Sequence, residues 1–262
     1  MKTLLICQDG APLDQVVLAR WLSSFSELTG VVVIEEPTSR KWRRVRREME
    51  RIGIIRFLDI IAFRLYYRLF LQSHDKQWES QQVRVRCAKY REIAPDTPII
   101  RTPSPNTPGV ELFVRQANPD LVLARCKTLL KESIFSIPRN GTFVMHPGIC
   151  PEYRNAHGCF WALVNGDLDK VGMTLLRIDK GIDTGPPFGY YTYPFDEAQE
   201  SHFVVQNRVV LENLDALSGK LVEIFNGKAA SIDTTGRKSA AWGQPWLTKY
   251  LLWKARTRRR RN

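Results

Sequence analysis

Thr142-Phe-Val-Met-His146-Pro-Gly-Ile-Cys-Pro-Glu-Tyr-Arg154 is the stretch of this chain that decides the fold. Its first five residues are an apolar run that ends in a histidine, as in a buried strand whose last side chain projects at the carboxyl edge of a sheet. Open α/β sheets bind their ligands at that edge. Asp183 follows 37 positions later, in a turn between two glycines. Its carboxylate could hold the imidazole of His146 in one tautomer or favour its charged form.

Segments with strand and helix patterns alternate along the whole chain. Strands are predicted at 2–7, 30–34, 99–100, 120–124, 142–146, 171–178 and 188–193, and helices at 13–24, 108–117, 128–134, 157–165 and 201–226. Residues 40–71 are predicted to form a basic amphipathic helical insertion, broken near Gly53. This order predicts an α/β fold with a doubly wound, mostly parallel, Rossmann-like sheet.

Four ordered segments resemble the formyltransferases that use 10-formyltetrahydrofolate, a family that includes methionyl-tRNA, glycinamide ribonucleotide and nucleotide-sugar enzymes. His146 matches the histidine of the family's Asn-x-His motif, and residues 150–154 match the loop after it. Residues 179–185 match the Asp-x-Gly-x-Asp-Thr-Gly turn, and residues 118–139 resemble the segment that leads into the catalytic strand. The resemblance implies the formyltransferase fold and formyl transfer from 10-formyltetrahydrofolate to an amine.

The same resemblance implies roles for individual residues. His146 would transfer the proton and stabilise the oxyanion, with Asp183 as its partner. The pterin of the formyl donor would lie against the 179–183 loop and the segment near 125–130. The residues implied to bind it are Leu129, Asp179, Gly181 and Ile182. No metal is implied.

Val144 departs from the family pattern, because the family carries an asparagine two residues before the histidine. In the family that amide helps to hold the oxygen of the tetrahedral intermediate. Losing one such donor typically costs about 100- to 1000-fold in turnover. Arg125, then Asn155, then Lys127 are the candidates to replace it, in that order. His157, at a predicted helix start, is either a further substrate contact or a structural residue.

The chain contains five cysteines. They form no C-x-x-C pair, which favours buried thiols over a zinc site or a disulfide framework. Cys150, close to His146 in sequence, leaves a thiolate–imidazole pair as a minor alternative. The net charge of +12 is concentrated in residues 37–71 and 249–262, each of which carries +7.

The two basic segments allow three interpretations. They are solvated helix faces, or residues 246–261 bind an anionic membrane surface through aromatic anchors and arginines. The third interpretation, binding to a nucleic acid such as tRNA, is less favoured, because the chain after the motif region is too short for the RNA-binding domain of the methionyl-tRNA enzymes. The first residues are too short an apolar stretch for a signal peptide, and charges inside 54–71 argue against a membrane span. These features predict a cytoplasmic protein, either free or held at the inner membrane surface.

The predicted organisation has three parts. A catalytic domain spans 1–200 and includes the insertion at 40–71, a C-terminal helix and extension spans 201–239, and an aromatic, arginine-rich tail spans 240–262. The acceptor is predicted to be a small amine of anionic or sugar type. Two alternatives stay open: a formyltetrahydrofolate hydrolase, and a non-catalytic folate-binding module associated with a membrane or a nucleic acid.

Overall fold

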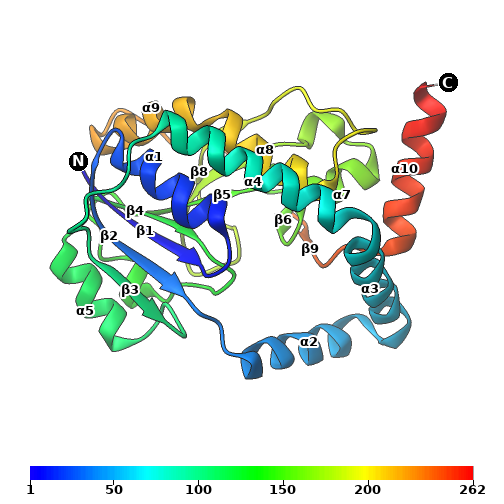
Figure 1. Ribbon diagram of the computed structural model, residues 1–262, viewed down its shortest axis with the longest axis horizontal. Helices are drawn as coiled ribbons and strands as arrows, with labels where there is room; N and C mark the ends of the chain where they lie inside the picture. The colour runs from blue at the N-terminus through cyan, green and yellow to red at the C-terminus, as the bar shows by residue number, and fades with distance from the viewer. Residues whose placement is uncertain (262) are drawn as a thin grey trace.

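The computed structural model describes the backbone of residues 1–261, with all their side chains except those of 40, 41, 44 and 261. Within these residues, seven strands form one sheet of order β3-β2-β1-β4-β5-β7-β8 (Figure 1). The first five pair in parallel, and β7 and β8 are antiparallel additions at one edge. The predicted mostly parallel, Rossmann-like sheet is therefore confirmed. The strands are β1 (Lys2–Gln8), β2 (Glu27–Ile34), β3 (Ile99–Thr102), β4 (Leu121–Arg125), β5 (Thr142–His146), β7 (Met173–Arg177) and β8 (Pro187–Tyr191).

Both faces of the sheet are covered, because alternate side chains of the central strands point to opposite sides. In β1, Leu5 and Cys7 join one apolar cluster, and Leu4 and Ile6 join the other. The larger cluster lies under the π-helical turn η1 (Leu13–Leu18), α1 (Ala19–Ser23), α4 (Gln72–Lys89), α7 (Gly158–Asn165), α8 (His202–Glu212) and α9 (Leu214–Phe225). The smaller cluster lies under α5 (Pro108–Ala117) and α6 (Glu132–Phe135).

The helix predicted at 128–134 is wrong, since only Glu132–Phe135 is helical. The reason lies in Asn106, whose side chain bonds the backbone of this segment from both sides. Its amide donates to the Leu129 carbonyl at 2.8 Å, and its carbonyl accepts from the Lys131 N–H at 2.8 Å. These long-range bonds replace the local bonds that a helix would have made.

The helix predicted at 201–226 is divided into α8 and α9 at Asn213. Asn213 has φ −108° and ψ 11°, which ends the helical path. Its side-chain amide donates to the carbonyls of Thr192 and Val209 at 3.0 and 2.7 Å. Both helices pack into the larger apolar cluster of the sheet, so this segment shares the core of residues 1–200.

The predicted tail is largely a helix, α10 (Leu247–Arg261). It packs against the body through Tyr250 and Trp253, which are 4% and 1% exposed. The indole N–H of Trp253 donates to Glu197 Oε2 at 2.9 Å. Both rings had been expected as membrane anchors, and their burial makes that expectation wrong for these two residues. Asn262 lies outside the described residues.

The predicted basic insertion forms two helices, α2 (Thr38–Ile52) and α3 (Ile54–Tyr66), that meet at Gly53. Gly53 has φ 81°, a left-handed conformation that favours glycine. Helix α3 continues through the π-helical turn η2 (Tyr67–Leu71) into α4, which the sequence analysis missed. Among the described helices, none combines the length and apolar character needed to cross a bilayer.

A second, two-stranded sheet brings the end of the chain back to the motif region. Strand β6 (Arg154–Asn155) pairs in parallel with β9 (Ala241–Trp242). The segment after α9 therefore returns to the carboxyl edge of the main sheet. Residues far apart in sequence meet there.

Candidate active site

His146, the last residue of β5, and Asp183, in the loop between β7 and β8, lie in contact. The Nδ1 atom of His146 is 3.3 Å from Asp183 Oδ2. The imidazole is 5% exposed, and the carboxylate is 17% exposed. The same carboxylate oxygen accepts the backbone N–H of Asn155 at 2.8 Å. The structure thus brings together the two residues that the sequence analysis had paired.

The second nitrogen of the imidazole is also occupied. His146 Nε2 is 2.7 Å from the carbonyl oxygen of Tyr153, which can only accept, so Nε2 carries a proton. Nδ1 faces the Asp183 carboxylate, which also accepts the Asn155 N–H, so both ring nitrogens lie next to oxygen atoms of the protein.

Two glycines permit this close approach of loop and histidine. A Cβ added at Gly148 would lie 2.5 Å from the Tyr153 oxygen and 2.9 Å from His146 Nε2. A Cβ added at Gly158 would lie 2.6 Å from Gly148 Cα. Side chains at either position would push the 147–155 loop away from the imidazole.

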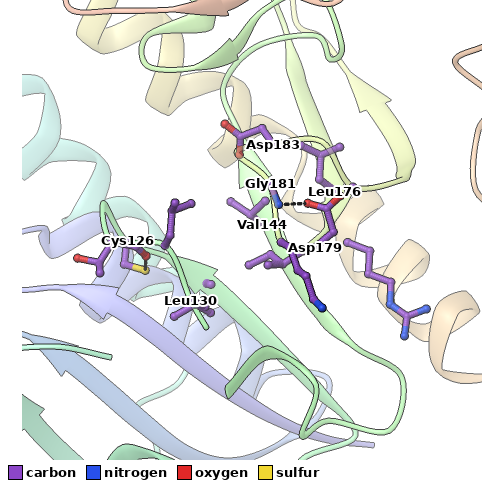
Figure 2. A pocket seen from close by; sticks show the side chains of 14 residues that line it. Cys126, Leu130, Val144, Leu176, Asp179, Gly181 and Asp183 are labelled. Carbon is purple, nitrogen blue, oxygen red and sulfur yellow. Dashed lines mark hydrogen bonds between the residues drawn. The ribbon is translucent and has the colours of Figure 1, made fainter. Parts of the chain in front are cut away.

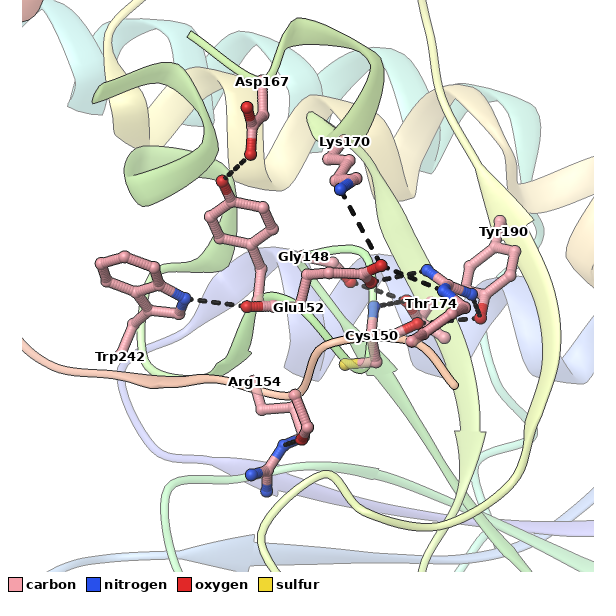
Figure 3. A network of polar contacts seen from close by, with 12 residues as sticks. Gly148, Cys150, Glu152, Arg154, Asp167, Lys170, Thr174, Tyr190 and Trp242 are labelled. Atoms are coloured by element: carbon pink, nitrogen blue, oxygen red, sulfur yellow. Dashed lines mark hydrogen bonds and ion pairs between the residues drawn. The ribbon is translucent and has the colours of Figure 1, made fainter. Parts of the chain in front are cut away.

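A polar network fixes the same loop from its other side (Figure 3). The hydroxyl of Thr174 donates to the Gly148 carbonyl at 2.7 Å and accepts from the Cys150 N–H at 3.0 Å. Glu152 accepts two bonds from Arg237, at 3.0 and 2.6 Å. The charged pair and the hydroxyl hold the loop rigidly, so the Tyr153 carbonyl is fixed where it meets His146.

The 179–185 turn is built by Asp179. Its carboxylate accepts from the Gly181 N–H at 2.9 Å and from the Thr184 hydroxyl at 2.8 Å. Gly181 and Gly185, the glycines on either side of Asp183, are not among the glycines with positive φ. Asp183 itself takes the left-handed conformation, with φ 50°. The glycines are needed for space, because an added Cβ would lie 1.9 Å from Thr184 Oγ1 or 1.8 Å from the Arg177 carbonyl oxygen.

One cavity of about 80 Å³ opens beside this turn (Figure 2). Figure 2 shows Cys126 and Leu130 on one side of it and Asp179, Gly181 and Asp183 on the other. Val144 also lines it, at the place where the resembled family carries its asparagine. The wall is mainly apolar, with the backbone of the turn along one edge. Its remaining lining residues are Ala124, Thr128, Leu129, Leu176, Arg177, Ile178, Lys180 and Gly185.

A second cavity of about 220 Å³ is also lined by Asp183. Asp183, Leu176 and Gly185 line both cavities, so they form the boundary between them. The second cavity is more polar and carries two arginines. Its other lining residues are Cys150, Pro151, Arg154, Thr184, Pro187, Thr234, Arg237 and Ser239. His146 is not among the described residues that line either cavity.

The two arginines of the second cavity differ in their pairing. Arg237 is neutralised by Glu152 through two bonds. Arg154 donates instead to neutral oxygens, Ser239 Oγ at 2.8 Å and the Ile182 carbonyl at 2.8 Å. Neither oxygen cancels its charge, which therefore remains available to an anionic ligand.

The three residues proposed to replace the missing amide all lie outside the two cavities. Arg125 binds Asp14 Oδ1 at 3.1 Å and the Met145 carbonyl at 2.7 Å. The side-chain amide of Asn155 donates to the Trp242 carbonyl at 2.6 Å. Lys127 is exposed in the loop after β4. The expected substrate groups Arg125 and Asn155 thus have structural partners, and Asn155 reaches the site only through its backbone.

His157 lies on a different side of the loop, at the start of α7, with φ 56°. Its ring centroid is 6.0 Å from that of His202, in an aromatic cluster with Phe63 and Phe160. Burial lowers the pKa of His157 to about 4. These contacts support the structural interpretation of His157 over a substrate contact.

Cys150 lines the second cavity but is 2% exposed. Burial is the largest cause that raises the pKa of its thiol, with Asp183 adding to the effect. A raised pKa disfavours the thiolate and therefore the thiolate–imidazole alternative.

Sequence reasoning missed the contribution of the C-terminal extension. Thr234, Arg237 and Ser239 line the second cavity although they follow the 179–185 turn by about fifty residues. No local motif marks them. Their place follows from the pairing of β9 with β6, which only the folded chain reveals.

Comparison with known proteins identifies relatives of this chain. A family model described as "Formyl transferase" matches residues 72–219, which is more than half of the chain. The methionyl-tRNA formyltransferase of Geobacter sulfurreducens is 32% identical over 139 residues, 48% of this chain and 42% of the relative. That of Caldanaerobacter subterraneus is 27% identical over 161 residues, 60% of this chain and 51% of the relative. The chain thus spans about half the length, or less, of these relatives.

Solved structures share the fold at low sequence identity. A sugar N-formyltransferase from a Shewanella species aligns with a TM-score of 0.56 and 13% identity, covering 98% of this chain and 88% of that one. A phosphoribosylglycinamide formyltransferase from Anaplasma phagocytophilum aligns with a TM-score of 0.53 and 13% identity, covering 94% and 99%. These alignments extend the shared fold beyond the segment that the family model matches.

Proposed function

This chain belongs to the formyl transferase family, and from that premise we propose that it transfers a formyl group from 10-formyltetrahydrofolate to a small amine. The observation that carries the proposal is the position of Asp183, which lines two cavities of different character. A carboxylate at the boundary of two substrate cavities would be within reach of the amine that attacks. The catalytic domain proposed at 1–200 would supply that carboxylate, and the extension at 201–239 would complete the acceptor cavity.

We assign the smaller cavity to the formyl donor. Its apolar wall suits a flat ring, and the polar backbone of residues 179–181 lies along one edge. Leu129, Asp179 and Gly181 line it, in support of their expected role, and Ile182 contributes a carbonyl that orients Arg154. A volume of 80 Å³ has room for several water-sized groups, since one water needs about 10–15 Å³. The bound donor would present its formyl carbon toward Asp183.

We assign the larger cavity to the acceptor. The uncancelled charge of Arg154 and the hydroxyl groups of Thr184, Thr234 and Ser239 suit a sugar or an anionic group. The volume of 220 Å³ is in keeping with a small molecule. A small amine of sugar or anionic type therefore remains the favoured acceptor over a charged tRNA.

Asp183 is the proposed catalytic base, and His146 is the proposed positioning residue. An amine that attacks the formyl carbon must lose a proton, which the Asp183 carboxylate would accept at the boundary of the cavities. The bond between the formyl carbon and the donor nitrogen then breaks, that nitrogen takes the proton back from Asp183, and tetrahydrofolate leaves. His146 would hold that carboxylate through Nδ1 while Tyr153 fixes the imidazole through Nε2. From the sequence, His146 was expected to transfer the proton and Asp183 to support it. We propose the reverse assignment, because His146 lines neither cavity.

The test is a turnover assay of the full chain with 10-formyltetrahydrofolate, with and without amino sugars, phosphorylated amines and charged tRNA. Release of tetrahydrofolate that depends on an amino sugar or phosphorylated amine supports the proposal. Release at the same rate in water alone identifies a hydrolase. Folate binding without any turnover identifies a non-catalytic module. We also propose that the protein is located in the cytoplasm, which cell fractionation would test.

A further inference from the structure

Helix α3 and the turn η2 carry a continuous row of exposed apolar side chains. The helix buries Ile60 and Phe63 against the body, at 1% and 4% exposure. On the opposite side, residues spaced three or four apart face solvent. This apolar row consists of Ile54, Ile55, Leu58, Ile61, Leu65 and Leu69, with exposed fractions between 41% and 86%.

Positive charge lies beside the apolar row. Arg64 and Arg68 are exposed on the same helix, next to the row by helical spacing. Asp59, the one acidic residue in 54–71, is bound by the backbone N–H of Thr248 at 3.0 Å and by its hydroxyl. The row is therefore flanked by cations, and the nearest acid of the helix is turned toward α10.

Neighbouring helices extend this surface. Phe70 of η2 shares a cavity of about 510 Å³ with Leu251 and Arg258 of α10, so the two helices expose apolar and cationic groups together. Phe70 and Leu251 are 67% and 47% exposed. On the other flank, α2 exposes Trp42, Arg43 and Arg47, whereas its Arg46 and Arg51 are paired with glutamates of the same helix. Exposed apolar and cationic side chains thus occur together on the three adjacent helices α2, α3 and α10.

We propose that α3 docks on the surface of an anionic lipid bilayer, lying in the plane of the headgroups. Aliphatic side chains would enter the acyl boundary while arginines bind lipid phosphates, as in interfacial amphipathic helices. The inference concerns the exposed face of α3, not the buried rings of α10. It does not depend on the proposed chemistry.

Other occupants explain only part of this surface. A second copy of the chain would bring Arg64 and Arg68 of both copies into one interface, where like charges repel. A nucleic acid would account for the arginines but leave six large aliphatic side chains in water. A bilayer with anionic headgroups accounts for both.

Helices α2 and α3 lie on the side of the molecule toward which strands β1 and β2 point (Figure 1). The carboxyl edge of the sheet, where the candidate site lies, is turned to the same side.

The test is sedimentation of the full chain with vesicles. We expect the protein to pellet with mixed phosphatidylcholine–phosphatidylglycerol vesicles and to stay in solution with phosphatidylcholine alone. Binding should weaken as salt is raised, because the arginine contacts are screened. The triple variant Leu58→Gln, Leu65→Gln, Leu69→Gln should lose about tenfold or more of its partitioning. The double variant Arg64→Glu, Arg68→Glu should lose the preference for the anionic lipid.

Matched controls come from surfaces on other elements. Leu112 of α5 is 58% exposed, as is Leu65, and Leu112→Gln should leave sedimentation unchanged. Arg91, exposed after α4, serves in the same way as Arg91→Glu. Circular dichroism checks that each variant is folded.

Three results would overturn the proposal. The first is a wild-type protein that stays in solution with anionic vesicles at low salt. The second is an apolar-row variant that sediments as well as the wild type and the Leu112→Gln control. The third is a dimer in solution, or an RNA complex, that the same substitutions abolish while vesicle binding persists.

Discussion

Asp183 lines two cavities and contacts the imidazole of His146, which lines neither of them, with Nδ1 3.3 Å from Oδ2. Both nitrogens of the imidazole have partners inside the protein. Asp183 is therefore the member of the pair that borders the cavities. Because only one of the two residues lines the cavities, substitutions at Asp183 and at His146 are expected to have different effects.

Asp183→Asn should lower turnover by about 100- to 10,000-fold, the usual contribution of a general base. His146→Gln keeps an N–H that can reach the Tyr153 carbonyl, so it should lose less and should shift the pH profile of turnover. Steady-state kinetics of both variants, with thermal melts as a fold check, measure this. Equal losses in the two variants would show that His146 takes part directly.

Val144→Asn should raise turnover, by up to about 100-fold if the missing amide limits the reaction. Val144 lines the smaller cavity, two residues before His146, so a new amide there would face the proposed donor. Val144→Thr has nearly the same shape and serves as the control. If Val144→Asn lowered turnover and Val144→Thr did not, another group would already hold the oxyanion.

Arg154→Gln should raise the KM for the acceptor by about 10- to 100-fold, because hydrogen bonds to a charged group contribute about 1.5–3 kcal/mol. The KM for the formyl donor should stay unchanged, since Arg154 lines the larger cavity. Lys180→Gln is the matched control, as its side chain is 76% exposed and the residue lines the smaller cavity. A change in the donor KM alone would reverse our assignment of the two cavities.

His202→Phe should make stability less dependent on acid pH. Burial lowers the pKa of His202 from 6.5 to about 3, so between these values the unfolded chain binds a proton that the folded chain does not. Stability from this group is complete above pH 6.5 and is lost as the pH falls toward 3. The melting temperature of the variant should fall less between pH 6.5 and 4, with His157 responsible for part of the remaining slope. An identical slope in both proteins would contradict the prediction.

Gly148→Ala should destabilise the protein and displace the loop that bonds His146. The added Cβ would lie 2.5 Å from the Tyr153 oxygen, a contact that the backbone must move to relieve. Gly219→Ala, in α9 with open space around it, should instead stabilise by about 0.5–1 kcal/mol. Urea denaturation of the two variants gives the comparison, and a neutral Gly148→Ala would mean that the loop adapts freely.

Several parts of the fold could be predicted because their signals are local. The apolar run of β5 and its terminal histidine were confirmed residue for residue. The break at Gly53 was also confirmed, because a left-handed backbone position favours glycine. Helix α4 was missed since its 18 residues are polar on most sides and show no apolar periodicity.

In the candidate site, too, only features with a local sequence signal could be predicted. His146 and Asp183 could be paired from a motif, since each stands at a position with a characteristic local pattern. The engagement of Arg125 by Asp14 could not, because 111 positions separate them in sequence. The same holds for Asn155, whose amide is taken by a carbonyl 87 positions away.

By itself, the sequence determined the two local elements that carry the candidate residues. These are an apolar strand that ends in His146 and a tight turn that carries Asp183. Only the tertiary structure decided which of the two borders a cavity. Solvent access, partner geometry and cavity walls arise from segments that come together after folding, such as residues 234–239 beside the 179–185 turn. Local patterns set local structure, whereas exposure and hydrogen-bond partners depend on contacts between distant parts of the chain.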